Sequence, residues 1–182
     1  MTEHLPEFRT VEAFVAWEER QVDKYEFADG VVSLFPGGAI RHYTVVMNVA
    51  STLNGRLGPG HVHAEGPKHL TKTSCRYPDV SVTFDGRDAP DLTYARFPTL
   101  IVEVLSPATQ ATDRGPKADE YRTVETLQEY VMIDSRKRWA QTMRRRGEDW
   151  TVSLPITSGT LTFESVGVSL SFDEVYAGTG LE

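Results

Sequence analysis

Two acidic residues of this 182-residue chain stand in runs that otherwise have the apolar character of buried strands. Asp79 lies within 77–82, which reads Tyr-Pro-Asp-Val-Ser-Val, and Glu103 lies within 100–105, which reads Leu-Ile-Val-Glu-Val-Leu. Burying a carboxylate in an apolar strand is costly unless a partner compensates its charge. Mg²⁺ binds one or two carboxylates and completes its shell with water and phosphate oxygens. The pair therefore predicts a divalent-metal site at Asp79 and Glu103.

Lys117 is the candidate for the cation that would act beside such a metal. It follows Gly115-Pro116, where proline suits the first turn of a helix. A lysine there could stabilise negative charge that develops on a phosphoryl group. The alternative is a surface ion pair with Asp113, four residues earlier. The acids have alternatives too: a turn or N-cap carboxylate for Asp79, and a buried salt bridge for Glu103.

A second candidate metal site contains histidines. His61 and His63 lie on one face of an expected strand, with Glu65 close behind them. Imidazole is a ligand for zinc and iron, so this pattern permits a small β-rich metalloenzyme as an alternative. A half-exposed strand with polar residues facing outward explains the same pattern without a metal.

The composition limits the classes of protein to which the chain can belong. Its formal net charge of −7 counts against a sequence-independent nucleic-acid binder. The basic residues within 136–146 form either a solvated sheet edge or a phosphate-tracking patch. Cys75 is the only cysteine, which excludes an internal disulfide and a Cys-rich zinc site. We see no signal peptide and no apolar run long enough to span a bilayer, so we expect a cytoplasmic protein.

Apolar periodicity and turn signals predict a mixture of helices and strands. Helices are expected from the N-cap Thr10 to about residue 20, over 42–57, after Gly115-Pro116 and, as a short turn, over 173–176. Residues 85–96 are expected to form a loop. Strands are expected at 25–27, 31–35, 61–65, 69–74, 78–84, 99–105 and 129–134, with a last antiparallel set at 139–145, 150–154, 161–163 and 168–170.

These elements predict an α+β (mixed α/β) fold, with a mixed β-sheet flanked by helices, in one domain over residues 1–182. The Glu103 strand, the helix around Lys117 and the strand 129–134 are expected to form one crossover unit, which would make these two strands parallel.

Several of these segments together resemble a known family. They are the run Pro-Asp-Val-Ser-Val at 78–82, the run Ile-Val-Glu-Val-Leu-Ser-Pro-Ala-Thr at 101–109, and then Asp113, Lys117 and Tyr121. In this order they resemble the bacterial Uma family of endonucleases, within the PD-(D/E)XK nuclease superfamily. The hairpin at 25–30, His42 and the closing strand at 168–172 extend the resemblance over residues 10–176.

The resemblance implies a restriction-endonuclease-like core and hydrolysis of phosphodiester bonds in DNA that depends on Mg²⁺ or Mn²⁺. Asp79 and Glu103 match the two superfamily acids. The superfamily lysine is expected two residues after the second acid, where this chain has Leu105, so Lys117 is expected to replace it. The resemblance adds possible accessory residues, namely Glu26, His42, Asp113 and Tyr121.

The accessory residues have simpler readings. Glu26 could be a strand carboxylate that faces water, and His42 could cap the apolar face of its helix. We expect a homodimer, because nucleases of this type often pair and two-fold dimers are the commonest oligomers. The main alternative function keeps the fold but loses catalysis, leaving a nucleic-acid-binding or protein-interaction module.

Overall fold

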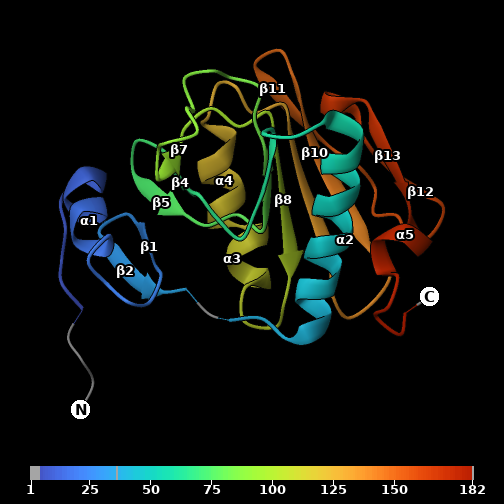
Figure 1. Ribbon diagram of the computed structural model, residues 1–182, viewed down its shortest axis with the longest axis horizontal. Helices are drawn as coiled ribbons and strands as arrows, with labels where there is room; N and C mark the ends of the chain where they lie inside the picture. The colour runs from blue at the N-terminus through green and yellow to red at the C-terminus, as the bar shows by residue number, and fades with distance from the viewer. Residues whose placement is uncertain (1–4, 36, 182) are drawn as a thin grey trace.

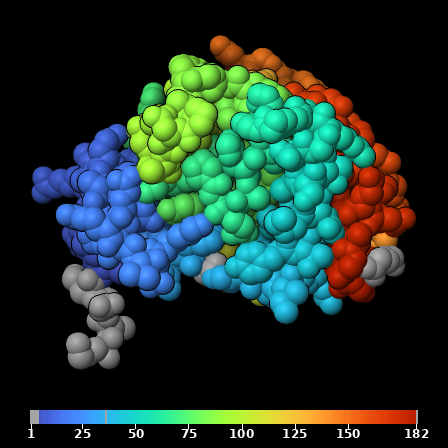
Figure 2. All heavy atoms as spheres, in the orientation of Figure 1, coloured from blue at the N-terminus to red at the C-terminus, as the bar shows by residue number. Residues whose placement is uncertain are grey.

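The computed structural model describes residues 5–35 and 37–181. Within them the strands form a six-stranded sheet, a five-stranded sheet and a two-stranded sheet. In Figure 1 the N-terminal elements lie at one end of the molecule and the C-terminal elements at the other, with the six-stranded sheet between them. The space-filling view shows the same division. The cyan atoms of α2 (Ile40–Leu57) lie between the two ends, on the face toward the viewer (Figure 2).

The six-stranded sheet has the order β11-β10-β9-β8-β6-β3. Strands β8 and β9 are parallel, and the other neighbours are antiparallel, so the sheet is mixed as expected. Helices α3 (Gln110–Arg114) and α4 (Pro116–Arg122) form the crossover between β8 and β9. The strands are β3 (Val62–Ala64), β6 (Val80–Val82), β8 (Leu100–Leu105), β9 (Glu129–Asp134), β10 (Ala140–Arg146) and β11 (Asp149–Val152).

Helix α2 (Ile40–Leu57) covers one face of this sheet. Its residues Val45, Val46, Val49 and Leu53 are fully buried against strand residues such as Val102. They recur at helical spacing, which is why the sequence predicted this helix. The same core includes residues of β12 (Thr160–Phe163), β13 (Val168–Ser171) and α5 (Phe172–Tyr176).

The opposite face of the sheet packs against α4. Ile101 and Leu105 of β8 join Tyr121 of α4 and Tyr130 of β9 in a separate buried cluster. Val102 and Val104 face α2 instead. Alternate side chains of a strand point to opposite faces, and here both faces are covered, so β8 reads as an almost continuous apolar run.

The five-stranded sheet has the order β2-β1-β5-β4-β7 and a core of its own. Phe14 of helix α1 (Val11–Glu18) stacks on Phe27, with ring centroids 5.2 Å apart. A hydrogen bond of 3.0 Å between His69 Nε2 and Ser81 Oγ joins this sheet to the six-stranded sheet. The strands are β1 (Tyr25–Ala28), β2 (Val31–Leu34), β4 (Lys68–Leu70), β5 (Ser74–Arg76) and β7 (Tyr94–Ala95).

Most predicted elements are present, but four differ from the prediction. The expected strand over 69–74 is split between β4 and β5, and the expected loop over 85–96 contains β7. Helix α3 was not predicted as a separate element. The last antiparallel set is divided, because β12 and β13 form a two-stranded sheet while β10 and β11 extend the large one. Strand β7 forms by parallel pairing with the distant β4, which is a tertiary effect that no local pattern reports.

Within the described residues, no helix combines the length and the apolar character needed to cross a bilayer.

The buried histidine between the two sheets should make stability depend on pH. Burial, and secondarily the nearby His63, lowers the pKa of His69 to about 3. The unfolded chain would bind this proton near pH 6.5, so the stability associated with neutral His69 is present above that pH and is lost as the pH falls toward 3. The variant His69→Gln lacks the titrating group. When the pH falls from 6.5 to 4.5, we predict that its unfolding free energy decreases by about 2 kcal/mol less than that of the wild type.

Urea unfolding at several pH values measures this difference. Parallel stability curves for the two proteins would contradict the account of His69.

Candidate functional site

The structure brings the two predicted acids side by side. Asp79 lies one residue before β6, Glu103 lies within β8, and the two strands pair with Val80 opposite Val102. The Val104 backbone N–H donates a 2.5 Å hydrogen bond to Asp79 Oδ2, which fixes that carboxylate against the Glu103 strand. Both side chains are buried.

Asp79 and Glu103 share one small cavity with the predicted lysine. Its volume is about 20 Å³. A cavity of this size holds about one water molecule or one ion. The acidic and basic side chains that line it are His42, Glu65, Asp79, Glu103, Asp113 and Lys117.

Lys117 reaches three carboxylates from the first turn of α4. Its Nζ lies 3.1 Å from Glu26 Oε1, 3.4 Å from Glu103 Oε1 and 3.4 Å from Asp113 Oδ1. Burial works against the charge of Lys117, but Glu103, Glu26 and Asp113 raise its pKa above the ordinary lysine value. The ion pair with Asp113 exists, but it is buried inside the site, so the expectation of a surface pair is wrong.

Glu103 is held by two residues of α4. Besides the pair with Lys117, its Oε1 accepts a 3.3 Å hydrogen bond from the Tyr121 hydroxyl, one helical turn further on. Burial raises the pKa of Glu103, and Lys117 opposes the rise. Burial likewise raises the pKa of Asp113, again opposed by Lys117. Tyr121 thus lies within reach of Glu103, and Asp113 within reach of Lys117.

Glu26 enters the site from the five-stranded sheet. Its Oε1 accepts a 3.1 Å hydrogen bond from the Tyr77 backbone N–H as well as pairing with Lys117, and its Oε2 accepts one of 3.1 Å from Arg76. Arg76 also pairs with Glu120. The reading of Glu26 as a strand carboxylate that faces water is therefore wrong, because the side chain is buried and fully engaged.

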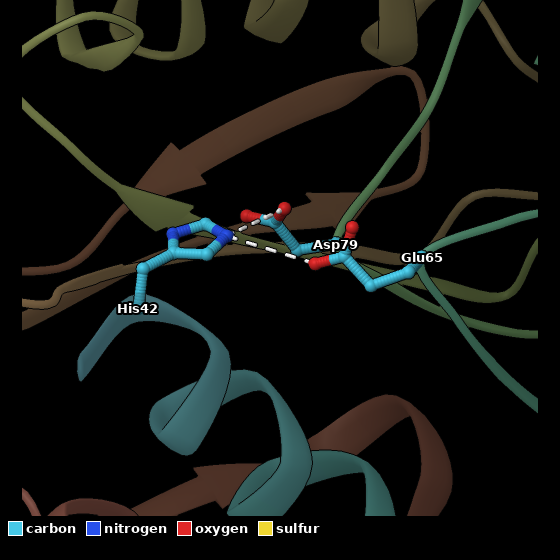
Figure 3. Close-up of side chains that lie close together, drawn as sticks. All are labelled: His42, Glu65 and Asp79. Atoms are coloured by element: carbon cyan, nitrogen blue, oxygen red, sulfur yellow. Dashed lines mark ion pairs between the residues drawn. The ribbon is translucent and has the colours of Figure 1, made fainter. Parts of the chain in front are cut away.

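On the other side of Asp79, His42 faces two carboxylates (Figure 3). His42 Nε2 lies 3.3 Å from Asp79 Oδ1 and 3.7 Å from Glu65 Oε1. Burial lowers the pKa of His42, but hydrogen bonding and charge from Asp79 and Glu65 overcome this effect and raise the pKa to about 10. His42 therefore does more than cap an apolar helix face.

Glu65 is the residue of this site that the sequence did not reveal. It follows β3, and its backbone N–H donates a 3.0 Å hydrogen bond to the Asp79 carbonyl, which continues the antiparallel pairing of β3 with β6. Its sequence signal was misleading, because Glu65 was noticed only as a neighbour of His61 and His63. The register that places it opposite Asp79 is non-local.

The His42–Glu65–Asp79 group has the properties of a cation site. One donor atom from each residue can be chosen so that the three lie within 4.8 Å of one another. Glu65 Oε1 is buried and accepts no short hydrogen bond, because its neighbour His42 Nε2 is 3.7 Å away. A buried acceptor without a partner is costly, and a bound cation would satisfy it.

The charge of the wider cluster points the same way. Among the described residues of this network, six carboxylates surround three basic side chains. Protons or a divalent cation must balance the excess, since uncompensated buried charges are strongly unfavourable. The carboxylates belong to Glu26, Glu65, Asp79, Glu103, Asp113 and Glu120, and the basic groups to His42, Arg76 and Lys117.

The alternative histidine site lacks this arrangement. In the described part of the chain, His61 and His63 belong to no group of three potential metal ligands. His61 Nδ1 lies 3.2 Å from the Thr83 carbonyl, and its ring packs on Phe84. The half-exposed strand is the reading that fits these contacts.

The basic residues near β10 are largely used within the protein. Arg144 pairs with Glu129 and Glu164, and Arg146 also pairs with Glu164. Arg145 donates to backbone carbonyls and lies over the Trp150 ring. These contacts favour a structural edge over a phosphate-tracking patch.

Removing the buried lysine should be strongly destabilising. Lys117→Met leaves the surrounding carboxylates without their cation, so we predict a loss of about 3–5 kcal/mol in unfolding free energy at pH 7. Chemical denaturation in the presence of EDTA measures the loss without added metal. The control is the exposed Lys72→Met, for which we expect a change within about 0.5 kcal/mol. Equal stability of both variants would show that Lys117 does not balance the buried acids.

Comparison with known proteins identifies a family and a shared fold. The family model Uma2, described as "Putative restriction endonuclease", matches residues 11–171. An uncharacterized protein of Synechocystis sp., slr1290, is 31% identical over an alignment of 172 residues that covers 92% of this chain and 90% of the relative. A second uncharacterized Synechocystis protein, sll1609, is 28% identical over 137 residues, covering 69% of this chain and 74% of the relative.

A solved structure has the same fold. It is described as a "putative nuclease belonging to DUF820" from Anabaena variabilis, and it superposes with a TM-score of 0.77 at 16% identity, covering 93% of this chain and 98% of the other. The family model and the shared fold together confirm the restriction-endonuclease-like core expected from the sequence. With the family model spanning most of its length, the chain belongs to the Uma2 family of restriction-endonuclease-like proteins.

Proposed function

We propose that this protein is a metal-dependent endonuclease that hydrolyses phosphodiester bonds in DNA. The observation that carries the proposal is the convergence of Asp79, Glu103 and Lys117 on one buried cavity. Asp79 and Glu103 would hold a divalent cation, Mg²⁺ or Mn²⁺, and Lys117 would assist the attacking water. A bound dication of this kind lowers the pKa of a water molecule and polarises a phosphoryl oxygen.

The chain's own residues then orient and compensate the reacting groups. Lys117 supplies a compact positive charge for the negative charge that develops on the phosphate. Glu26 and Asp113 hold its ammonium group in the cavity. The Tyr121 hydroxyl donates to Glu103 and limits the rotation of that carboxylate.

The displaced lysine is consistent with this role. Leu105 stands where the superfamily pattern has lysine, and its side chain is buried in the apolar cluster beneath α4. No charge can come from that position. Lys117 reaches Glu103 from the helix after β8, so the cation arrives at the same carboxylate from another element.

A larger cavity gives a route to the site. It has a volume of about 680 Å³ and shares Gly37, Gly38, His42 and Ser106 with the small one. Arg41 and Arg136 also line it. A nucleic-acid strand could meet these side chains locally even though the whole chain is acidic. Two copies of the chain, paired as a homodimer, would let each cut one strand of a duplex.

Cleavage of supercoiled and single-stranded DNA with Mg²⁺ or Mn²⁺ tests the proposal. We predict metal-dependent cleavage by the wild type and a loss of about 100-fold or more in Asp79→Asn and Glu103→Gln. The exposed Glu148→Gln, a matched change of charge on the β10–β11 turn, should cleave like the wild type.

Equal cleavage by all four proteins would indicate a contaminating nuclease and contradict the proposal. No cleavage by the wild type with either ion would favour the binding or interaction module.

A further inference from the structure

The donor atoms beside Asp79 are not all oxygens. His42 comes from the first turn of α2, Glu65 follows β3, and Asp79 precedes β6, so three separate elements bring their side chains together (Figure 3). The group offers one imidazole nitrogen and two carboxylates. Glu103 and Lys117 lie on the other side of Asp79 and are paired with each other.

The surrounding backbone holds each donor in place. The Val104 N–H binds Asp79 Oδ2 at 2.5 Å and leaves Oδ1 facing His42 at 3.3 Å. The Glu65 backbone is tied to the Asp79 carbonyl at 3.0 Å. The Glu65 Oε1 atom accepts no hydrogen bond and has His42 Nε2 at 3.7 Å, so it can take a further ligand at the point where the three side chains meet.

Gly38 is required for the position of the imidazole. A Cβ atom at position 38 would lie 2.6 Å from His42 Cδ2 and 2.9 Å from its Cγ. Such contacts are too short, and the ring could not stay where it is. The Gly38 N–H also donates a 2.9 Å hydrogen bond to the Tyr43 hydroxyl, which fixes the segment that packs on the ring. The ring is thus packed in place by its own chain.

We propose that His42, Glu65 and Asp79 form a mixed nitrogen–oxygen site that selects a transition-metal dication, with Mn²⁺ bound in preference to Mg²⁺. Mg²⁺ is a hard ion that takes oxygen ligands and retains its waters, whereas first-row transition metals accept imidazole readily. The inference deepens the proposed function and rests on it for its biological meaning, because it names the class of ion that the nuclease uses.

Metal binding to the protein without DNA tests this inference. The protein is stripped of metal and titrated calorimetrically with Mn²⁺ and with Mg²⁺. We expect Mn²⁺ to bind about tenfold more tightly or better. Pulsed electron paramagnetic resonance of the Mn²⁺ complex should show coupling to a directly bound ¹⁴N nucleus.

Three variants assign the donors. His42→Gln places an oxygen donor near the position of Nε2, so the nitrogen coupling should disappear and the preference for Mn²⁺ should fall toward unity. Glu65→Gln should weaken both ions by about tenfold or more. The exposed Glu148→Gln is the control, which should keep the nitrogen coupling, the Mn²⁺ preference and the affinity of the wild type. Circular dichroism and thermal unfolding check that each variant folds.

Three results would overturn the inference: equal affinity of the wild type for the two ions, nitrogen coupling that persists in His42→Gln, or no Mn²⁺ binding at all. These results are separable from the fate of the proposed function. Nitrogen-coordinated Mn²⁺ in a protein that never cleaves DNA would refute the nuclease and keep the site. DNA cleavage supported by Mg²⁺, in a protein whose Mn²⁺ complex shows no nitrogen coupling, would support the nuclease and refute the mixed nitrogen–oxygen site.

Discussion

The two larger sheets of this protein meet at a buried cluster in which carboxylates outnumber basic side chains. Lys117 is the centre of that cluster, since it pairs with Glu26, Glu103 and Asp113 at once. Carboxylates are rarely buried without compensation, because the interior does not solvate their charge. A fold that keeps this surplus must supply protons or bind a cation there. The excess of buried acidic groups is thus a property of the architecture as well as of any one side chain.

The cluster also explains how the two larger sheets are combined. Glu26 comes from β1 in the five-stranded sheet, Glu103 from β8 in the six-stranded sheet, and Lys117 from the helix that joins β8 to β9. Arg76 of β5 extends the network by binding Glu26 and Glu120. The hydrogen bond between His69 and Ser81 is a second polar link between the sheets. The sheets therefore meet through charged and polar groups, while each keeps a separate apolar core.

The sequence predicted those parts of the site whose signal is local. Asp79 and Glu103 could be recognised because each interrupts an apolar run, and Lys117 because Gly115-Pro116 marks the start of a helix. Glu65 could not be recognised, because its place beside Asp79 depends on the register of β3 against β6. For the same reason β7 was read as a loop, since the strand that pairs with it is the distant β4. The burial of Glu26 was not predicted, because it depends on the packing of a second sheet, which the pattern of single strands does not report.

Anomalous X-ray scattering from crystals grown with Mn²⁺ tests the central claim most directly, because it locates the ion without any assumption about activity. The account predicts a strong anomalous peak within coordination distance of His42 Nε2 and of the Glu65 and Asp79 carboxylates, roughly 2.0–2.3 Å by analogy with other first-row dications. Anomalous peaks confined to exposed carboxylates, with none at this group, would contradict the claim that the buried surplus of negative charge is a metal site.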